Sequence, residues 1–209
     1  MNPPVITIDG PSGTGKGTLA VRLTAWAGWH LLDSGALYRV VGHYAIAADL
    51  PVEFVVADGA VQVVLNGHDV TDEIRSEAAG GAASRVAVVP AVRAGLLSRQ
   101  RDFRQPPGLV ADGRDMGTVV FPQAELKIFL TASPAERAQR RYKQLKQKGI
   151  DVNLARLSED IAERDRRDQE RQLSPLQPAF DAIILDTTAL DIVAVEDSVK
   201  ALAKERGLV

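Results

Sequence analysis

The fold is decided by two adjoining stretches, Val5-Ile6-Thr7-Ile8-Asp9 and Gly10-Pro11-Ser12-Gly13-Thr14-Gly15-Lys16-Gly17-Thr18. The first is a run of β-branched residues, which is typical of a strand buried in a parallel sheet. The second has the spacing of a P-loop, in which small residues let backbone N–H groups turn around phosphate oxygens at the start of a helix. The lysine can then reach the β- and γ-phosphates. These nine loop residues, Gly10 to Thr18, are therefore the predicted ATP site.

One position departs from the common P-loop pattern. Many P-loops place Ser or Thr directly after the lysine to bind Mg²⁺. This chain has Gly17 there, and the hydroxyl comes one residue later at Thr18. The Gly-Lys-Gly-Thr form resembles the nucleoside monophosphate kinases. Mg²⁺ is the expected cofactor beside ATP, and its direct ligation by this loop stays open.

Apolar runs alternate with helical patterns along the rest of the chain. Further short strands are predicted at 30–33, 108–112, 126–130 and 182–186. Helices are predicted from the P-loop to Gly28, over 36–48, from the capping box Ser133-Pro134-Ala135-Glu136 to Lys148-Gly149, over 153–171 and over 192–204. This order is that of a doubly wound sheet. The predicted fold class is α/β, a three-layer P-loop kinase fold with a five-stranded parallel sheet.

The middle of the chain has a different character. Val61, Val63 and Leu65 alternate up to Asn66-Gly67, which is the signature of a two-residue hairpin. A stretch rich in Ala and Gly (76–89) and a basic helix (91–105) follow. Antiparallel structure inside a βα pattern indicates an insertion. We therefore predict a core at 1–55 and 106–209 and an inserted subdomain at 56–105. The resemblance to the nucleoside monophosphate kinases implies that the core is a kinase core with a short helical lid at about 140–175, and that the insertion is the NMP-binding subdomain.

Composition narrows the class of protein. The 209 residues are 45% hydrophobic and 25% charged, with a formal net charge of −2, which gives no overall signal for binding nucleic acid or membrane. The absence of cysteine excludes disulfides, thiolate metal sites and cysteine nucleophiles, and it fits a reducing compartment. The sequence shows neither a signal-peptide pattern nor a long apolar stretch. We expect a cytoplasmic monomer that binds small molecules and has no nucleic-acid or membrane partner.

Two further segments stand directly after predicted strands. They are Asp33-Ser34-Gly35-Ala36-Leu37-Tyr38-Arg39 and Ala111-Asp112-Gly113-Arg114-Asp115-Met116-Gly117-Thr118. The carboxyl ends of adjacent parallel strands form the ligand crevice of such a sheet, so both segments should face bound phosphates. Together with the P-loop they resemble the cytidylate kinases. The likeness spans nearly the whole chain, and Asp-Gly-Arg-Asp-Met-Gly is its most specific part.

This resemblance implies a reaction, transfer of the γ-phosphoryl group of ATP to CMP or dCMP, with Mg²⁺, to give ADP and CDP or dCDP. It also implies an acceptor site made of Ser34, Tyr38, Arg39, Ser84, Arg93, Asp115, Arg164 and Asp168. Arg39 would lie on the acceptor phosphate. At the base, a carboxylate at Asp115 would attract the N4 amino group of cytosine and repel the carbonyl that uracil carries there. Asp112 would order Mg²⁺ through water, although an aspartate that ends a strand is also a common turn former.

An arginine-rich helix carries the lid prediction. Leu157, Ile161, Arg164, Asp168 and Arg171 are spaced four, three, four and three apart, which puts them on one helix face. Charge runs are usually solvated faces, so composition alone favours an exposed helix with ion pairs. The family likeness favours a lid facing nucleotides, with Arg164 and Asp168 at the ribose. Arg137 and Arg141 on the preceding helix are further lid candidates, and the predicted catalytic group is Lys16, Arg114, Arg171 and Arg141.

Two other functions fit the P-loop alone. A kinase of the same fold with a different nucleotide or small-molecule acceptor would share the sheet and the loop, because function lives in the site. A nucleotide switch that regulates partners would need a guanine-reading Asn-Lys-x-Asp segment, which the chain lacks. The three histidines show no metal-ligand or triad spacing and are interpreted as structural or surface residues.

Overall fold

The computed structural model describes residues 2–44, 51–57, 59–147 and 149–209. Its main sheet has the strand order β2-β6-β1-β7-β8 and is parallel throughout. The strands are β1 (Val5–Asp9), β2 (His30–Asp33), β6 (Leu109–Asp112), β7 (Leu126–Thr131) and β8 (Ile183–Asp186). The predicted five-stranded parallel sheet is confirmed. Because β1 is central, the P-loop that follows it leaves the middle of the carboxyl edge.

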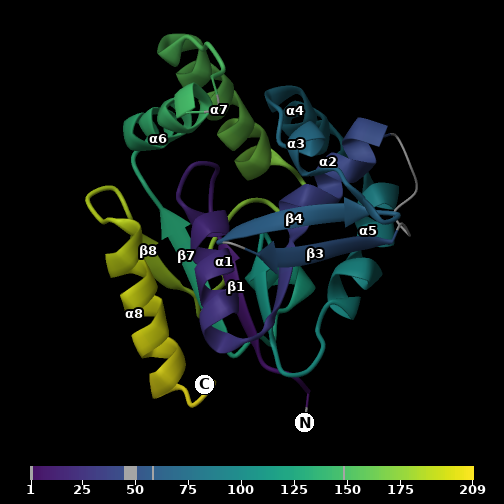
Figure 1. Ribbon diagram of the computed structural model, residues 1–209, viewed down its shortest axis with the longest axis vertical. Helices are drawn as coiled ribbons and strands as arrows, with labels where there is room; N and C mark the ends of the chain where they lie inside the picture. The colour runs from purple at the N-terminus through teal and green to yellow at the C-terminus, as the bar shows by residue number, and fades with distance from the viewer. Residues whose placement is uncertain (1, 45–50, 58, 148) are drawn as a thin grey trace.

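Helices cover both faces of this sheet, as Figure 1 shows. α1 (Lys16–Ala27) and α8 (Ile192–Glu205) pack on one face, and α2 (Ser34–Tyr44) packs on the other. Alternate residues of β1 enter the two cores: Val5 joins the core under α2, and Ile6 joins the core under α1 and α8. Burial on both faces is why this strand is apolar or β-branched up to Asp9.

A second sheet of three antiparallel strands lies beside α1. Its strands are β3 (Val52–Ala57), β4 (Ala60–Leu65) and β5 (His68–Asp69). The predicted hairpin at Asn66-Gly67 is confirmed, with φ of 51° and 78° at the two turn residues. Strand β3 was not predicted from the sequence. The segment continues through α3 (Thr71–Ile74), α4 (Glu77–Val86) and α5 (Pro90–Asp102), so the basic helix ends before the predicted 105.

Two helices stand together at the end of the molecule where the P-loop lies, at the top of Figure 1. They are α6 (Pro134–Gln147) and α7 (Leu154–Glu170), and Ala138, Leu145, Leu157 and Ile161 form a small core between them. The apolar half of the predicted stripe on α7 therefore faces α6.

Several predicted helix ends shift in the structure. α2 begins at Ser34 rather than at 36, because Asp33 accepts a hydrogen bond from the Ala36 N–H and so caps an earlier start. The predicted end of this helix at Ala48, and Lys148 at the end of α6, lie outside the described residues. Among the described helices, none has both the length and the apolar character needed to cross a bilayer.

Candidate active site

The P-loop turns tightly between β1 and α1, and two of its glycines are required by the space around them. Gly10 has φ 143°, and a Cβ there would lie 2.1 Å from the carbonyl oxygen of Leu130. Gly13 has φ 82°, and its Cβ would lie 2.9 Å from the Cβ of Arg137. No L-residue with a side chain fits either position without a shift of the neighbouring backbone. The predicted loop conformation thus depends on glycine at both places.

Lys16 is the first residue of α1 and is buried. Its ammonium group donates a hydrogen bond to the carbonyl oxygen of Pro11, 2.8 Å away within the same loop. Burial lowers the pKa of Lys16, and the carboxylate of Asp112 opposes that effect. The cation therefore lies inside the curve of the loop, where a bound phosphate would replace the carbonyl as its partner.

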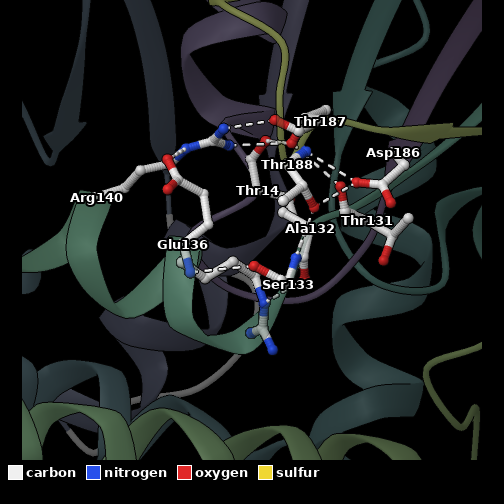
Figure 2. A network of polar contacts seen from close by, with 10 residues as sticks. Thr14, Thr131, Ala132, Ser133, Glu136, Arg140, Asp186, Thr187 and Thr188 are labelled. Carbon is white, nitrogen blue, oxygen red and sulfur yellow. Dashed lines mark hydrogen bonds and ion pairs between the residues drawn. The ribbon is translucent and has the colours of Figure 1, made fainter.

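A polar network ties the P-loop to α6 and to the loop after β8, as Figure 2 shows. Arg140 of α6 forms an ion pair with Glu136 at 2.8 Å. It also donates to the hydroxyl oxygen of Thr187 at 3.0 Å and to the carbonyl oxygen of Thr187 at 2.6 Å. The Thr187 hydroxyl lies 3.3 Å from the carbonyl oxygen of Thr14 in the P-loop. Arg140 thus fixes Thr187, which in turn contacts the P-loop.

This network explains why the predicted capping box at the start of α6 forms only in half. The N–H of Glu136 donates to the Ser133 hydroxyl at 3.3 Å, as the box requires. The return bond is missing, because Arg140 engages the Glu136 carboxylate and the N–H of Ser133 donates to the Thr188 hydroxyl at 2.9 Å. The helix start is thereby attached to the loop after β8.

Arg137, a predicted lid residue, joins the P-loop to α7. Its buried guanidinium group donates to the carbonyl oxygen of Ser12 at 3.1 Å and forms an ion pair with Asp165 of α7 at 2.6 Å. A third bond reaches the Ala132 carbonyl oxygen at 3.1 Å. These contacts give Arg137 a linking position. The neighbouring Arg141, predicted to be catalytic, reaches the carbonyl oxygen of Arg75 at 3.5 Å and so lies toward the middle segment.

Two aspartates meet where adjacent strands end. Asp33 of β2 is in register with Asp112 of β6. Burial raises the pKa of Asp112, Lys16 opposes this, and Asp33 adds to it. A Cβ placed on Gly17 would lie 3.4 Å from Asp112 Oδ2. The carboxylate thus stands beside the position that carries the Mg²⁺-binding hydroxyl in other P-loops.

The carboxylate of Asp112 fits the predicted Mg²⁺ if water and substrate phosphates supply the other ligands. Among the described residues, no group of three or more His, Cys, Asp or Glu side chains converges on a point. Mg²⁺ is commonly held by one or two carboxylates, with water and substrate phosphates completing its octahedron. Asp112 meets that requirement, and its predicted role as a ligand through water is compatible with the geometry.

A pocket lies at the carboxyl edge of the sheet, and residues from four segments far apart in the chain line it. The segments are α2, α4, the loop after β6, and the end of α7 with the residue that follows it. Of the predicted acceptor and catalytic residues, those in its lining are Ser34, Tyr38, Ser84, Arg114, Asp115, Arg164, Asp168 and Arg171. Arg39 and Arg93 are not part of this lining. Six of the eight predicted acceptor residues are therefore brought together in the lining, and Arg93 is joined to it by an ion pair with Asp115.

Asp115 of the lining forms an ion pair with Arg93 of α5. Arg93 also donates to the Ser174 hydroxyl at 2.7 Å, and its guanidinium carbon lies 6.0 Å from the centre of the Tyr38 ring. Burial raises the pKa of Tyr38 to about 12, so its phenol stays protonated at neutral pH. The buried hydroxyl of Ser84 has no hydrogen-bond partner among the described residues. Such a group is usually satisfied by a ligand or water.

Positive charge surrounds Asp168, another residue of the lining. Arg114 forms an ion pair with Asp168 of α7. Burial alone would raise the pKa of Asp168, but Arg114, Arg164 and Arg171 hold it below its ordinary value. Burial likewise opposes the charge of Arg114, and Asp168 holds its pKa above the ordinary value. Three arginines around one carboxylate leave excess positive charge, which suits a phosphate.

Arg171 differs from its prediction in one respect. α7 ends at Glu170, and Arg171 follows with extended backbone (ψ 136°) rather than on the last helical turn. Its side chain donates to the Ser174 carbonyl oxygen, and one of its terminal nitrogens is buried without a partner in the described structure. Leaving the helix lets the residue turn back over the pocket.

Four side chains of this site were not singled out from the sequence: Asp9, Asp33, Asp165 and Ser174. Asp9 and Asp33 end strands at the ligand edge, and the signal that selected Asp112 would also have found them. Asp165 stands among alternating charges that pattern alone does not rank. Ser174 lies in an irregular loop and carries no sequence signal.

Comparison with known proteins agrees with this geometry. The cytidylate kinase family model matches residues 6–205. A cytidylate kinase of Aeromonas hydrophila is 55% identical over 218 aligned residues, covering 97% of this chain and 95% of the relative. Relatives of the same name from Pseudomonas aeruginosa and Nitrosococcus oceani are 54% and 56% identical, covering 98% and 92% of this chain and 96% and 92% of their own. Among solved structures, a gluconokinase from Sinorhizobium meliloti is similar in fold, with a TM-score of 0.52, 16% identity and coverage of 98% of this chain and 94% of its own.

Proposed function

Because the chain belongs to the cytidylate kinase family, we propose that it transfers the γ-phosphoryl group of ATP to CMP or dCMP. The products are ADP and CDP or dCDP. The observation that carries this proposal is the pocket lined by α2, α4, α7 and the loop after β6, at the sheet edge where the P-loop begins. It provides a separate place for an acceptor next to the place for ATP.

The base-reading end of the pocket supports a cytosine acceptor. The Asp115 carboxylate accepts a hydrogen bond from an amino group such as N4 of cytosine, and it repels the carbonyl that uracil presents instead. Arg93 holds Asp115 in place, and the buried Ser84 hydroxyl lacks a partner that a base would supply. A site whose polar groups go unpaired with the wrong base discriminates strongly.

The reaction needs positioning and positive charge more than it needs a base, because the acceptor phosphate is already an anion. We assign Lys16 to the β- and γ-phosphates, Arg114 and Arg171 to the phosphates between donor and acceptor, and Arg141 to the lid. Arg39, with Asp33 beside it, would bind the acceptor phosphate, and Arg164 and Asp168 the ribose. Mg²⁺, held through water by Asp112, would neutralise charge on the ATP phosphates. Closing the lid would exclude water and so limit hydrolysis of ATP.

We propose the same domain organisation that the sequence predicts. The segment 56–105 would bind the acceptor, the lid at about 140–175 would close over it, and 1–55 with 106–209 would form the core. We further propose a monomer that works in the cytoplasm in pyrimidine metabolism. Size-exclusion chromatography with light scattering tests the oligomeric state.

The proposal is tested by ADP release from ATP and Mg²⁺ with CMP, dCMP, UMP, AMP, GMP or dTMP as acceptor. Rapid turnover with CMP and dCMP, weak turnover with UMP and none with purines is the expected result. Silence with every nucleotide would refute the proposal and favour a kinase of this fold with a small-molecule acceptor.

A matched pair of variants tests the base-reading role. Asp115→Asn keeps one acceptor oxygen and adds an NH₂ group that can donate to the uracil carbonyl, so kcat/KM for CMP over UMP should fall by about tenfold or more. Asp102→Asn makes the same change at the exposed end of α5 and should leave that ratio unchanged. Equal ratios in the two variants would remove Asp115 from the base site.

A further inference from the structure

Asp9 is a buried carboxylate that the proposed reaction does not use. It ends β1 and directly precedes Gly10 of the P-loop, and it is only 4% exposed. Oδ1 accepts a hydrogen bond from the N–H of Met116 at 2.8 Å, and Oδ2 accepts one from the N–H of Gly117 at 2.8 Å. One side chain of the P-loop strand therefore holds two consecutive backbone groups of the segment that follows β6.

Those two N–H groups open an unusual turn. Met116–Val120 is a short π-helix, a form that is rare and frequent at functional sites. The first N–H groups of any helix have no partner inside it and need an outside acceptor. Asp115 occupies the cap position, where an aspartate ordinarily supplies that acceptor itself. Here its side chain makes no capping bond.

Asp9 thus performs the capping that Asp115 would otherwise perform. Because the two N–H groups already have an acceptor, the Asp115 carboxylate is free to turn outward to Arg93 and the pocket. The fit behind the turn is close: a Cβ on Gly117 would lie 3.0 Å from Thr7 Oγ1 and 3.4 Å from Asp9 Oδ2. The turn consequently rests directly on β1.

The burial of Asp9 has an electrostatic cost. Burial raises its pKa to about 7, the two backbone hydrogen bonds oppose this, and Asp115 raises it further. An apolar residue at the end of β1 would avoid that cost but would leave the Met116 and Gly117 N–H groups without an acceptor.

We propose that Asp9 is a positioning residue for acceptor recognition, which caps the Met116–Val120 turn from the P-loop strand and so leaves the Asp115 carboxylate free for the base. This inference rests on the proposed function, because it concerns how the same pocket reads its acceptor. Asp9 is not among the residues that line the pocket. Its effect reaches the substrate through Asp115.

The first test is Asp9→Asn. An asparagine keeps one acceptor oxygen but directs an NH₂ group at the other N–H, so one hydrogen bond is lost and two donors face each other. Asp115 should then turn to cap its own helix. We expect KM for CMP to rise and kcat/KM for CMP over UMP to fall, each by about tenfold or more, as loss of a hydrogen bond to a charged group implies. KM for ATP should stay within about twofold, because the P-loop contacts are unchanged.

Thr7→Val is the matched control. Thr7 lies two residues earlier on the same face of β1, it is fully buried, and its hydroxyl has no hydrogen-bond partner in the described structure. The change preserves shape at the same contact with Gly117 and removes no bond. All kinetic constants of Thr7→Val should match those of the unchanged protein.

Three results would overturn the inference. One is an Asp9→Asn protein whose CMP-over-UMP ratio is unchanged, and another is equal losses for ATP and CMP, which a purely structural role would give. If Asp9→Asn does not fold, Gly117→Ala moves the turn off Asp9 without changing charge, and an unchanged ratio there is the third. Failure of the unchanged protein to phosphorylate CMP would instead refute the proposed function together with this inference.

Discussion

Replacing Arg140 by alanine should lower the free energy of unfolding and raise KM for ATP. The change removes the two hydrogen bonds to Thr187, which is 2% exposed, and an ion pair with the more exposed Glu136. The Thr187 carbonyl oxygen keeps the N–H of Leu190 at 3.2 Å, so no buried group is orphaned. Loss of charge-assisted bonds without an orphan costs about 2 kcal/mol. In a chain of this length that lowers Tm by about 4–8 °C.

Arg166→Ala is the control for this prediction. Arg166 of α7 has two ion-pair partners, Glu163 and Glu170, but its side chain is 56% exposed and theirs are 50% and 62% exposed. Pairs of that kind contribute about 0–1 kcal/mol, so this variant should change the free energy of unfolding little. Urea unfolding followed by circular dichroism measures both free energies, and steady-state kinetics measures KM for ATP and for CMP.

The two variants should separate in both assays. Arg140→Ala should raise KM for ATP and leave KM for CMP nearly unchanged, because Thr187 lies against Thr14 of the P-loop and is not in the lining of the pocket proposed for the acceptor. Equal destabilisation by the two substitutions would show that burial does not decide the strength of these ion pairs. A rise in KM for CMP instead of ATP would refute the reasoning, because it would show that Arg140 and Thr187 support the acceptor site and not the P-loop.

Three more changes have definite expected outcomes. Asp168→Asn removes the carboxylate proposed to bind the ribose, so KM for CMP should rise about tenfold or more even though Arg114 loses a competing partner, with Glu170→Gln as an exposed control that changes nothing. Asp9 has a raised pKa of about 7 and therefore binds a proton more tightly in the folded state than in the unfolded state. The stability that comes from this tighter proton binding is lost as pH rises from about 4 to 7. Because asparagine does not titrate, the stability deficit of Asp9→Asn measured by urea unfolding should shrink between pH 5 and pH 8. Gly17→Ser places a hydroxyl beside Asp112 Oδ2. The hydroxyl should donate a hydrogen bond to that carboxylate and so compete with the water that Mg²⁺ would bring. The Mg²⁺ concentration needed for half-maximal rate should therefore rise.

The features that could be predicted from the sequence are local ones. The P-loop follows from a β-branched run and glycine spacing, and the Asn66-Gly67 hairpin follows from two turn residues. Strand β3 was missed because it is defined by its antiparallel pairing with β4 on the other side of Gly59. Val52 lies opposite Leu65 in that pairing, and no single stretch of sequence encodes the register. Helical periodicity also leaves the depth of burial open. Trp26 is half-buried and packs against the core under α1 and α8, with Lys200 and Lys204 of α8 over its ring.

Trp29, just past the end of α1, is 8% exposed and lies against Gly108, where a Cβ would be 2.4 Å from Trp29 Cδ2. Periodicity tells which face of a helix is apolar, but it does not tell which part of that face another element covers. The site shows the same division. The segment after β6 could be recognised from its residues, whereas the π-helical turn within it and its cap by Asp9 depend on contacts between distant strands.

Ion pairs explain how so many arginines can be gathered at one edge. Arg93 pairs with Asp115, Arg114 with Asp168, and Arg137 with Asp165. Without those carboxylates, burying each guanidinium would cost several kcal/mol. A phosphate bound at Arg114, as proposed, would compete with Asp168 and would bring more charge and more acceptor oxygens to the guanidinium group. Since Asp168 belongs to α7 and Arg114 to the loop after β6, this exchange would also change what holds α7, the proposed lid helix, to the sheet. Acceptor binding and the position of α7 would then be coupled through Asp168.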